Sequence, residues 1–154
     1  MIELRREAPD GPAARALWEE YMALVRERAG PEFEPTERIF GTVDAFRGPK
    51  GAWLVLYEDG APVACAGLRE LEPGVAEIKR MFVTPKARGR GHARRLLVEL
   101  ERQAREFGQR RMRLFTTDML HEAMALYAAE GYAIRSEHPL DGRSEYWLEK
   151  PLAS

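Results

Sequence analysis

The fold is decided by residues 78–97, which read IKRMFVTPKARGRGHARRLL. The first six residues complete a segment that begins at Val75 and is rich in residues typical of a strand. Pro85 ends that strand, and apolar residues then recur at helical spacing from Ala93 to Phe107. A helix that joins two strands in this way usually places them parallel in one sheet. The stretch therefore predicts a strand–loop–helix crossover.

The loop of this unit has the features of an anion-binding site. Gly89 and Gly91 precede the helix, and glycine lets the backbone adopt positive φ and approach a ligand closely. The first turn of a helix offers free N–H groups, and no Ser, Thr, Asp or Asn stands at this start to cap them. A bound phosphate would supply the missing acceptors. The alternative is a glycine turn with solvated arginines. The loop matches neither a Walker A motif nor a dinucleotide-binding fingerprint.

The remaining elements predict a mixed α+β sheet around this unit. Asp59-Gly60 is a strong hairpin signal. Strands are expected at residues 2–7, 53–57, 62–68, 75–83, 112–116, 132–134 and 146–148. Helices are expected from about Pro12 to Arg28 after an Asp10 cap, from a Thr36 cap through Val43, from 93 to 107, and from an Asp118 cap to Gly131. The hairpins predict antiparallel pairs beside the one parallel pair, with helices on both faces.

Length and composition restrict the class of protein. The 154 residues fit one domain, residues 1–154, and 45% hydrophobic with 32% charged residues excludes collagen-like, disulfide-scaffold and disordered chains. No apolar run approaches the length of a membrane helix, and the N-terminus shows no secretory signal. The single cysteine, Cys65, lies in an apolar stretch typical of buried packing. These features predict a cytoplasmic protein with no membrane partner.

Charge is unevenly distributed although the net charge is only −1. Ten basic and three acidic residues lie between Lys86 and Arg113, a segment suited to meeting an anion. No nucleic-acid partner is expected, because aromatic residues do not interleave the basic ones and the net charge is near zero. A second segment is acidic and is suited to attracting a cationic amine, the alternative being an ordinary solvated loop. Its acidic residues are Glu32, Glu34, Glu37 and Asp44.

Three motifs resemble the GNAT superfamily of N-acetyltransferases. Residues 88–93, RGRGHA, match its Arg/Gln-x-x-Gly-x-Gly/Ala signature, and FVTP at 82–85 resembles its Val-x-Pro strand end. Residues 125–132, ALYAAEGY, resemble its Leu-Tyr-x-x-x-Gly-Phe/Tyr segment. The order of elements is similar from end to end. The resemblance implies a GNAT-like α+β fold: a mostly antiparallel sheet of six to seven strands, helices on both faces, and a central parallel pair that splays apart.

The resemblance also implies acetyl-CoA as co-substrate and assigns its contacts. Its pyrophosphate would lie on the main-chain N–H groups of Arg88, Gly89, Arg90, Gly91, His92 and Ala93. The strand end would hydrogen-bond the pantetheine arm through Met81, Phe82 and Val83, with the Val83 N–H polarising the thioester carbonyl. The His92 imidazole would contact phosphate or face solvent. Leu120 stands where many members carry a cofactor-contacting Asn, and the widely spaced histidines predict no metal site.

Two residues are candidates for proton transfer. Tyr127 matches the phenol that protonates the leaving thiolate in the superfamily, and a phenol with a pKa of about 10 suits that task. The alternative is that Tyr127 only packs its helix onto the sheet. Glu77 resembles the catalytic glutamate of histone-type members, which takes the proton of the attacking amine. The alternative is an ion pair between Glu77 and Lys79 or an arginine on a neighbouring strand.

The resemblance implies direct attack by a primary amine of a small molecule or peptide in a ternary complex. The acceptor would enter between about residues 31–46 and 137–143, with candidate contacts at Phe33, Phe40, Trp53 and His138. Two other functions are considered: a non-catalytic acyl-CoA-binding sensor or partner domain, and a nucleic-acid-binding protein, which the charge disfavours. Members of the family often pair through the edge strand or the last strands, so the resemblance also suggests a homodimer.

Overall fold

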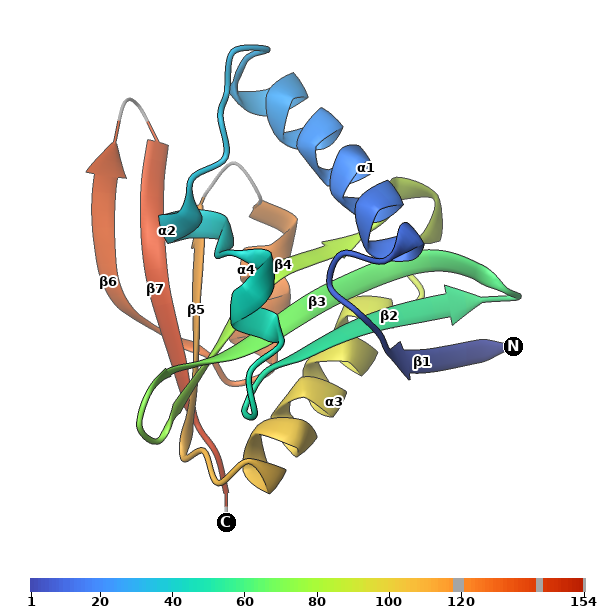
Figure 1. Cartoon of the computed structure of the whole chain (residues 1–154). Helices are drawn as coiled ribbons and strands as arrows, with labels where there is room; N and C mark the ends of the chain where they lie inside the picture. The colour runs from blue at the N-terminus through green and yellow to red at the C-terminus, as the bar shows by residue number, and fades with distance from the viewer. Residues whose placement is uncertain (118–120, 141–142, 154) are drawn as a thin grey trace.

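The computed structural model describes residues 1–117, 121–140 and 143–153, and its strands form one sheet. The strands are β1 (Ile2–Arg6), β2 (Ala52–Glu58), β3 (Ala61–Glu72), β4 (Val75–Val83), β5 (Arg111–Thr117), β6 (Ala133–Leu140) and β7 (Arg143–Pro151). The helices are α1 (Pro12–Ala29), α2 (Glu37–Phe40), α3 (His92–Glu106) and α4 (His121–Ala129), with 3-10 turns η1 (Val43–Phe46) and η2 (Pro85–Ala87). The strand order is β1-β2-β3-β4-β5-β7-β6, and β4–β5 is the parallel pair among antiparallel neighbours (Figure 1).

Helices cover both faces of the sheet, as predicted, and Figure 1 shows α1 and α3 on opposite sides. Strand alternation divides β2, so that Leu54 packs toward α3 whereas Trp53 packs toward α1. The core under α3 and α4 is largely aliphatic. The core under α1 and α2 is rich in aromatic rings, namely Tyr21, Phe40, Phe46, Trp53, Tyr57 and Phe82. The α1 face therefore supplies an aromatic wall beside the central strands.

The parallel pair separates part-way along its length. β4 and β5 are paired as far as Ile78 and Leu114 within the described residues. Just beyond that point β4 bulges, because its register against β3 shifts. Arg80 lies in the bulge with a φ of 57°, a left-handed conformation that is costly for any residue with a side chain. The predicted splayed pair is thus confirmed, and the functional pockets open where the two strands diverge.

Three local predictions differ from the structure. The helix expected from a Thr36 cap through Val43 ends at Phe40, and Val43 begins the separate turn η1. Gly11, not Asp10, is the N-cap of α1, because the Asp10 carboxylate instead forms an ion pair with Arg47 at 2.7 Å. The last two strands are much longer than predicted. Their charged residues interrupt the apolar pattern, and some of these residues pair across the hairpin, as Arg135 does with Glu149 at 3.6 Å.

The interior also accounts for the single cysteine. Cys65 is buried in the core under α1, and burial raises the pKa of its thiol to about 12. The thiol is therefore protonated at neutral pH and packs as a small apolar side chain, as predicted. Among the described residues, no helix has the length and apolar character needed to cross a membrane.

Candidate functional site

The glycine loop adopts the conformation that its sequence predicts. Gly89 and Gly91 have φ of 79° and 80°, and Gly91 is the N-cap of α3 in the left-handed region. No side chain caps this helix start. The first N–H groups of α3 are therefore left for an external acceptor, and the positive end of the helix dipole lies beside them.

A pocket opens against this loop, and we call it the loop pocket. It is lined by the loop, the end of β4, one face of α1 and α4. The lining residues are Tyr21, Leu24, Met81, Phe82, Val83, Ala87, Arg88, Gly89, Gly91, His92, Ala93, Arg94, Ala123, Leu126 and Tyr127. The structure thus brings the predicted cofactor residues together, except that Arg90 is not part of the lining. Leu120 lies outside the described residues.

Side chains of the loop hold its shape and do not fill the pocket. Arg90 forms an ion pair with Glu58, and the His92 Nε2 lies 2.9 Å from the second oxygen of the same carboxylate. Arg95 donates to the His92 Nδ1 at 3.1 Å and to the Arg90 carbonyl at 2.8 Å. Since a guanidinium can only donate, Nδ1 accepts and Nε2–H donates to Glu58. The His92 imidazole is 2% exposed, so the prediction that it faces solvent is wrong; its other predicted partner, a phosphate, would find both ring nitrogens engaged.

The main chain at the end of β4 offers a free donor. The Thr84 N–H donates to the Val63 carbonyl at 2.9 Å, which makes these residues a hydrogen-bonded pair of the antiparallel ladder. Val83 is opposite Ala64 in the next position of that ladder. Alternation therefore turns the Val83 N–H away from β3, toward the side from which β5 has departed. The Val83 carbonyl on that side accepts a hydrogen bond from Arg88 Nε at 3.2 Å.

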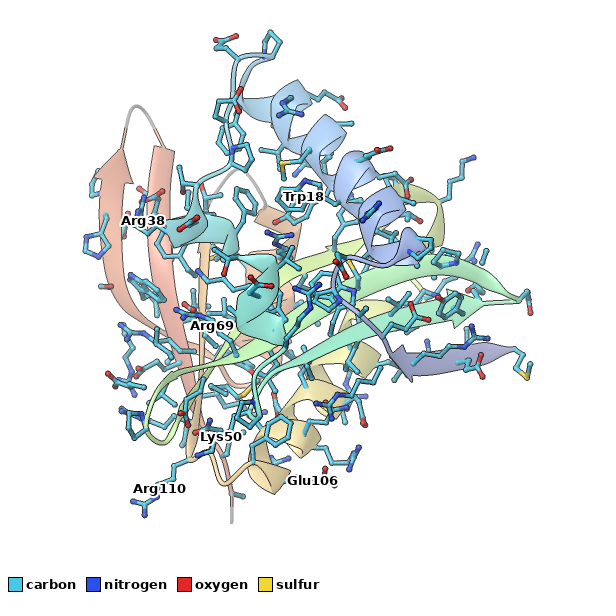
Figure 2. All side chains as sticks on the ribbon, viewed as in Figure 1. Trp18, Arg38, Lys50, Arg69, Glu106 and Arg110 are labelled. Carbon is cyan, nitrogen blue, oxygen red and sulfur yellow. The ribbon has the colours of Figure 1, made fainter. Side chains whose placement is uncertain are left out.

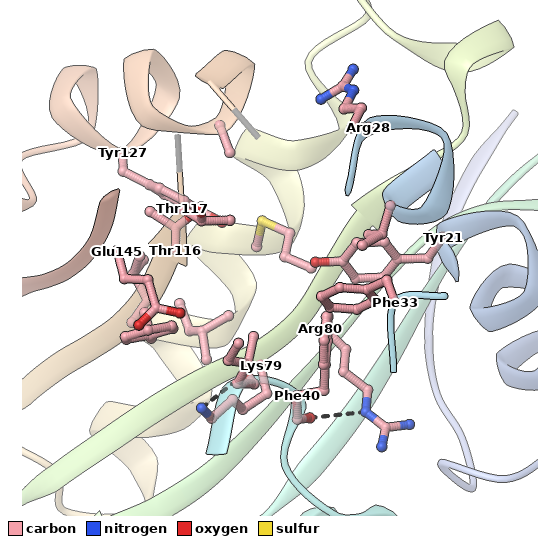
Figure 3. A pocket seen from close by; sticks show the side chains of 17 residues that line it. Tyr21, Arg28, Phe33, Phe40, Lys79, Arg80, Thr116, Thr117, Tyr127 and Glu145 are labelled. Carbon is pink, nitrogen blue, oxygen red and sulfur yellow. Dashed lines mark hydrogen bonds between the residues drawn. The ribbon is translucent and has the colours of Figure 1, made fainter. Parts of the chain in front are cut away.

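A second pocket lies between the diverging strands and α2, and we call it the aromatic pocket (Figure 3). It is lined by Tyr21, Val25, Arg28, Phe33, Ile39, Phe40, Ile78, Lys79, Arg80, Met81, Leu114, Phe115, Thr116, Thr117, Ala123, Tyr127 and Glu145. Figure 3 shows Tyr127, Thr116, Thr117 and Glu145 on one side of the pocket and Tyr21, Phe33 and Phe40 on the other.

The acceptor-site predictions are only partly matched by this lining. Phe33 and Phe40 belong to it, whereas Trp53 packs against Phe46 in the core under α1. His138 is exposed and bonds to Ser136 instead. The four acidic residues of the predicted amine-attracting segment are exposed and lie outside the lining. They behave as a solvated loop, which was the stated alternative.

The two pockets meet at Tyr127. Both linings include Tyr127, Met81, Tyr21 and Ala123, so the phenols of Tyr127 and Tyr21 border both spaces. Tyr127 is 5% exposed, and burial raises the pKa of its phenol above that of free tyrosine. Its hydroxyl has no hydrogen-bond partner within the described part of the chain, and it keeps its proton at neutral pH. The phenol is thus positioned to donate a proton to a group held between the pockets.

Glu77 is placed differently from Tyr127. It is fully buried, and its carboxylate contacts Arg69 Nε at 2.7 Å and Lys79 Nζ at 3.4 Å. It lines neither pocket. The ion pair that formed the alternative for Glu77 is therefore present, although buried and not on the surface, and the structure does not bring this carboxylate to Tyr127.

Lys79 and Arg80 hold α2 against the bulge of β4. Lys79 Nζ donates to the carbonyls of residues 38 and 39 at 2.7 and 3.1 Å. The Arg80 guanidinium donates to the carbonyls of residues 40 and 41 at 2.9 and 3.0 Å and stacks on Trp18. Two consecutive cations therefore bind four consecutive carbonyls at the negative end of a short helix. This clamp fixes the α2 wall of the aromatic pocket.

Sequence reasoning missed Glu145 and Arg38. Glu145 is 4% exposed, and Arg38 Nη2 donates to its two oxygens at 3.2 and 3.3 Å. Figure 2 shows Arg38 reaching from α2 toward β7. A signal for Glu145 was present in the sequence, because it lies two residues from Trp147 and so shares its strand face. Among the described residues, no group of three or more His, Cys, Asp or Glu is arranged to hold a metal ion.

Comparison with known proteins gives concordant matches. The chain matches the model of the acetyltransferase (GNAT) family over residues 12–132. It is 36% identical over 107 residues to an IAA acetyltransferase from Azospirillum brasilense, a match that covers 68% of this chain and 70% of that protein. It is 40% identical over 83 residues to the uncharacterized N-acetyltransferase YjgM from Escherichia coli K12, over 52% of this chain and 49% of that protein. The chain thus spans about half the length of YjgM.

Solved structures agree on the fold. An acetyltransferase of the GNAT family from Staphylococcus aureus Mu50 superimposes with a TM-score of 0.78 over 99% of this chain and 100% of that one, at 17% identity. The family match includes α1, the glycine loop and Tyr127, which are the parts that build the two pockets. The chain therefore belongs to the GNAT acetyltransferase family and is an acyltransferase.

Proposed function

We propose that this protein transfers the acetyl group of acetyl-CoA to a primary amine of a small molecule or peptide, by direct attack in a ternary complex. One observation carries the proposal: two pockets of different character share the buried phenols of Tyr21 and Tyr127, and Tyr127 is the one whose sequence resembles the proton donor of the family. A donor in the loop pocket and an acceptor in the aromatic pocket would meet at that residue. Holding two reactants in this way makes the transfer effectively unimolecular.

The loop pocket suits the donor through its main chain. The uncapped N–H groups of α3 and the preceding loop would bind the pyrophosphate. The exposed edge of β4 would bind the pantetheine arm, and the Val83 N–H would donate to the thioester oxygen as negative charge develops on it. Arg94, which lines this pocket, would add positive charge at its mouth.

The chemical step follows from this arrangement. The neutral amine nitrogen attacks the thioester carbon, and the carbon–sulfur bond of the resulting tetrahedral intermediate breaks. The thiolate leaves with the electron pair of that bond and takes the proton of the Tyr127 phenol. Burial raises the pKa of this phenol, so the proton is present throughout the neutral range. A proton-accepting role for Glu77 is not part of the proposal, because its carboxylate lies outside both pockets.

The test combines coenzyme A binding by calorimetry with thiol release from acetyl-CoA across a panel of amines. Tyr127→Phe should bind coenzyme A as the wild type does and lower turnover by about 100-fold, the usual scale for a positioned acid. Tyr57→Phe is the matched control, because it also removes a buried phenol, one that bonds Glu7 far from both pockets. Binding without turnover in the wild type would favour a non-catalytic sensor. No binding at all would overturn the proposal.

A further inference from the structure

The aromatic pocket contains one carboxylate within its described lining, that of Glu145. The residue lies on β7, and its Cα is paired with that of Thr117 on β5. Thr116 and Thr117 also line the pocket, and Figure 3 shows both between Glu145 and Tyr127. The carboxylate and the phenol therefore border the same space, beside two threonines that also line it.

The cations of the same pocket are already engaged by the protein. Lys79 binds two carbonyls and the Glu77 carboxylate, and Arg80 binds two further carbonyls. Arg28 also has an interaction partner. These groups therefore serve the architecture of the pocket wall and are poorly placed to bind a negatively charged acceptor.

The ion pair of Glu145 is weaker in geometry than these contacts. Arg38 uses a single nitrogen for both oxygens, at 3.2 and 3.3 Å, where a two-nitrogen fork would make shorter and stronger bonds. Its side chain is 57% exposed, whereas that of Glu145 is 6% exposed. The exposed Arg38 guanidinium, which also lies 5.2 Å from the centre of the Phe115 ring, thus neutralises a buried carboxylate, and an ammonium that made shorter bonds to that carboxylate would take over this role.

We propose that Glu145 binds the ammonium group of the acceptor and takes its proton, with Arg38 as the resident cation that the acceptor displaces. The surrounding wall is apolar and aromatic, with Val25, Phe33, Phe40 and Phe115. This combination fits a primary ammonium on an apolar or aromatic body, the class represented by phenethylamine. The inference rests on the proposed transfer reaction and names its acceptor.

The proton balance of the reaction is complete with these two residues. The bound ammonium gives one proton to Glu145 and becomes the neutral nucleophile. After attack, the nitrogen loses a second proton as the carbon–sulfur bond breaks, and the thiolate takes one from Tyr127. The second nitrogen proton restores the phenol, and the proton on Glu145 leaves to solvent with the products. One proton is released for each amide formed.

The test measures phenethylamine binding to the protein saturated with coenzyme A, by calorimetry, and phenethylamine acetylation by thiol release. Glu145→Gln keeps the size of the side chain but removes its charge. It should weaken phenethylamine binding by at least about tenfold, the scale of a lost charged hydrogen bond, while coenzyme A binding is unchanged. Glu145→Asp should recover part of the loss. Glu149→Gln is the matched control, because Glu149 is on the same strand but outside both pockets.

The outcomes separate this inference from the proposed function. Acetylation of other amines by the wild type, with no binding of phenethylamine or no effect of Glu145→Gln, overturns the inference alone. Failure to acetylate any amine overturns the proposed function. If Glu77→Gln lowers the rate of acetylation more than Glu145→Gln does, at equal thermal stability, the proton acceptor is Glu77 and not Glu145. Arg38→Gln should strengthen phenethylamine binding severalfold, and weaker binding would overturn the displacement of Arg38.

Discussion

The hydrogen-bond donors of the loop pocket are mainly main-chain groups, whereas the polar groups of the aromatic pocket belong to side chains. The first takes its donors from an uncapped helix start, two glycines with positive φ and the free edge of β4. The second takes its walls from α1, α2, β4, β5, α4 and β7, and its shape depends on buried charged contacts. A main-chain site can stay constant while side chains change. Under the proposed function, the donor site therefore depends little on particular side chains, whereas the acceptor site depends on them.

The largest effect is expected from Lys79→Met, which should impair the aromatic pocket and spare the loop pocket. The substitution leaves the buried Glu77 carboxylate with Arg69 alone and removes the two Lys79 hydrogen bonds of the four that hold α2 against the bulge of β4. We expect the free energy of unfolding to fall by about 3 kcal/mol, as when one partner of a buried ion pair is removed. Denaturant titration measures that loss. Coenzyme A binding by the folded protein should survive, and acceptor binding should not.

A double variant supplies the control for this prediction. Lys79→Met combined with Glu77→Gln leaves no unpaired buried charge and should recover most of the lost stability. Acceptor binding should remain impaired, because α2 still lacks the Lys79 half of its clamp. Equal stability in the single and double variants would show that Glu77 does not depend on Lys79.

The contrast between the pockets also explains what the sequence could predict. The strand–loop–helix unit was recognisable because its geometry follows from local features: Pro85, two glycines and a missing cap. The period of the apolar residues gave the sheet, the crossover and both helical layers. The positions of the last strands and of the α1 cap were less predictable, because ion pairs such as Asp10–Arg47 compete with local signals.

The acceptor side could not be predicted in the same way. Glu145 and Arg38 are 107 residues apart and meet only because α2 is clamped beside β7. The acidic segment near α2 was predicted to attract the amine, but its carboxylates are exposed and lie outside the pocket. Glu77 was recognised by resemblance, but its surroundings of Arg69 and Lys79 depend on strand register, which local sequence does not define.

Gly91→Ala should have an intermediate effect, and on the loop pocket only. A left-handed φ costs an alanine about 1–2 kcal/mol relative to glycine, and relief of that strain would turn the N–H groups away from the phosphates. We expect coenzyme A binding to weaken about tenfold, measured by calorimetry. Gly74→Ala is the matched control, since Gly74 has a φ of 87° in the β3–β4 turn and lines neither pocket. It should cost similar stability and leave coenzyme A binding unchanged.

The smallest effect is expected from substitution of the arginines near the loop pocket, because main-chain N–H groups supply most of the contacts to coenzyme A in the proposal. Arg94 lines the pocket, is 63% exposed and pairs with Glu130 at 3.2 Å, whereas Arg90 lies outside the lining and pairs with Glu58. Arg94→Gln should weaken coenzyme A binding about threefold at low salt, and less at high salt, because exposed charges are screened. Arg90→Gln should change it less. A loss from Arg94→Gln larger than that from Gly91→Ala would contradict the main-chain character of this pocket, because charge and not backbone geometry would then control binding.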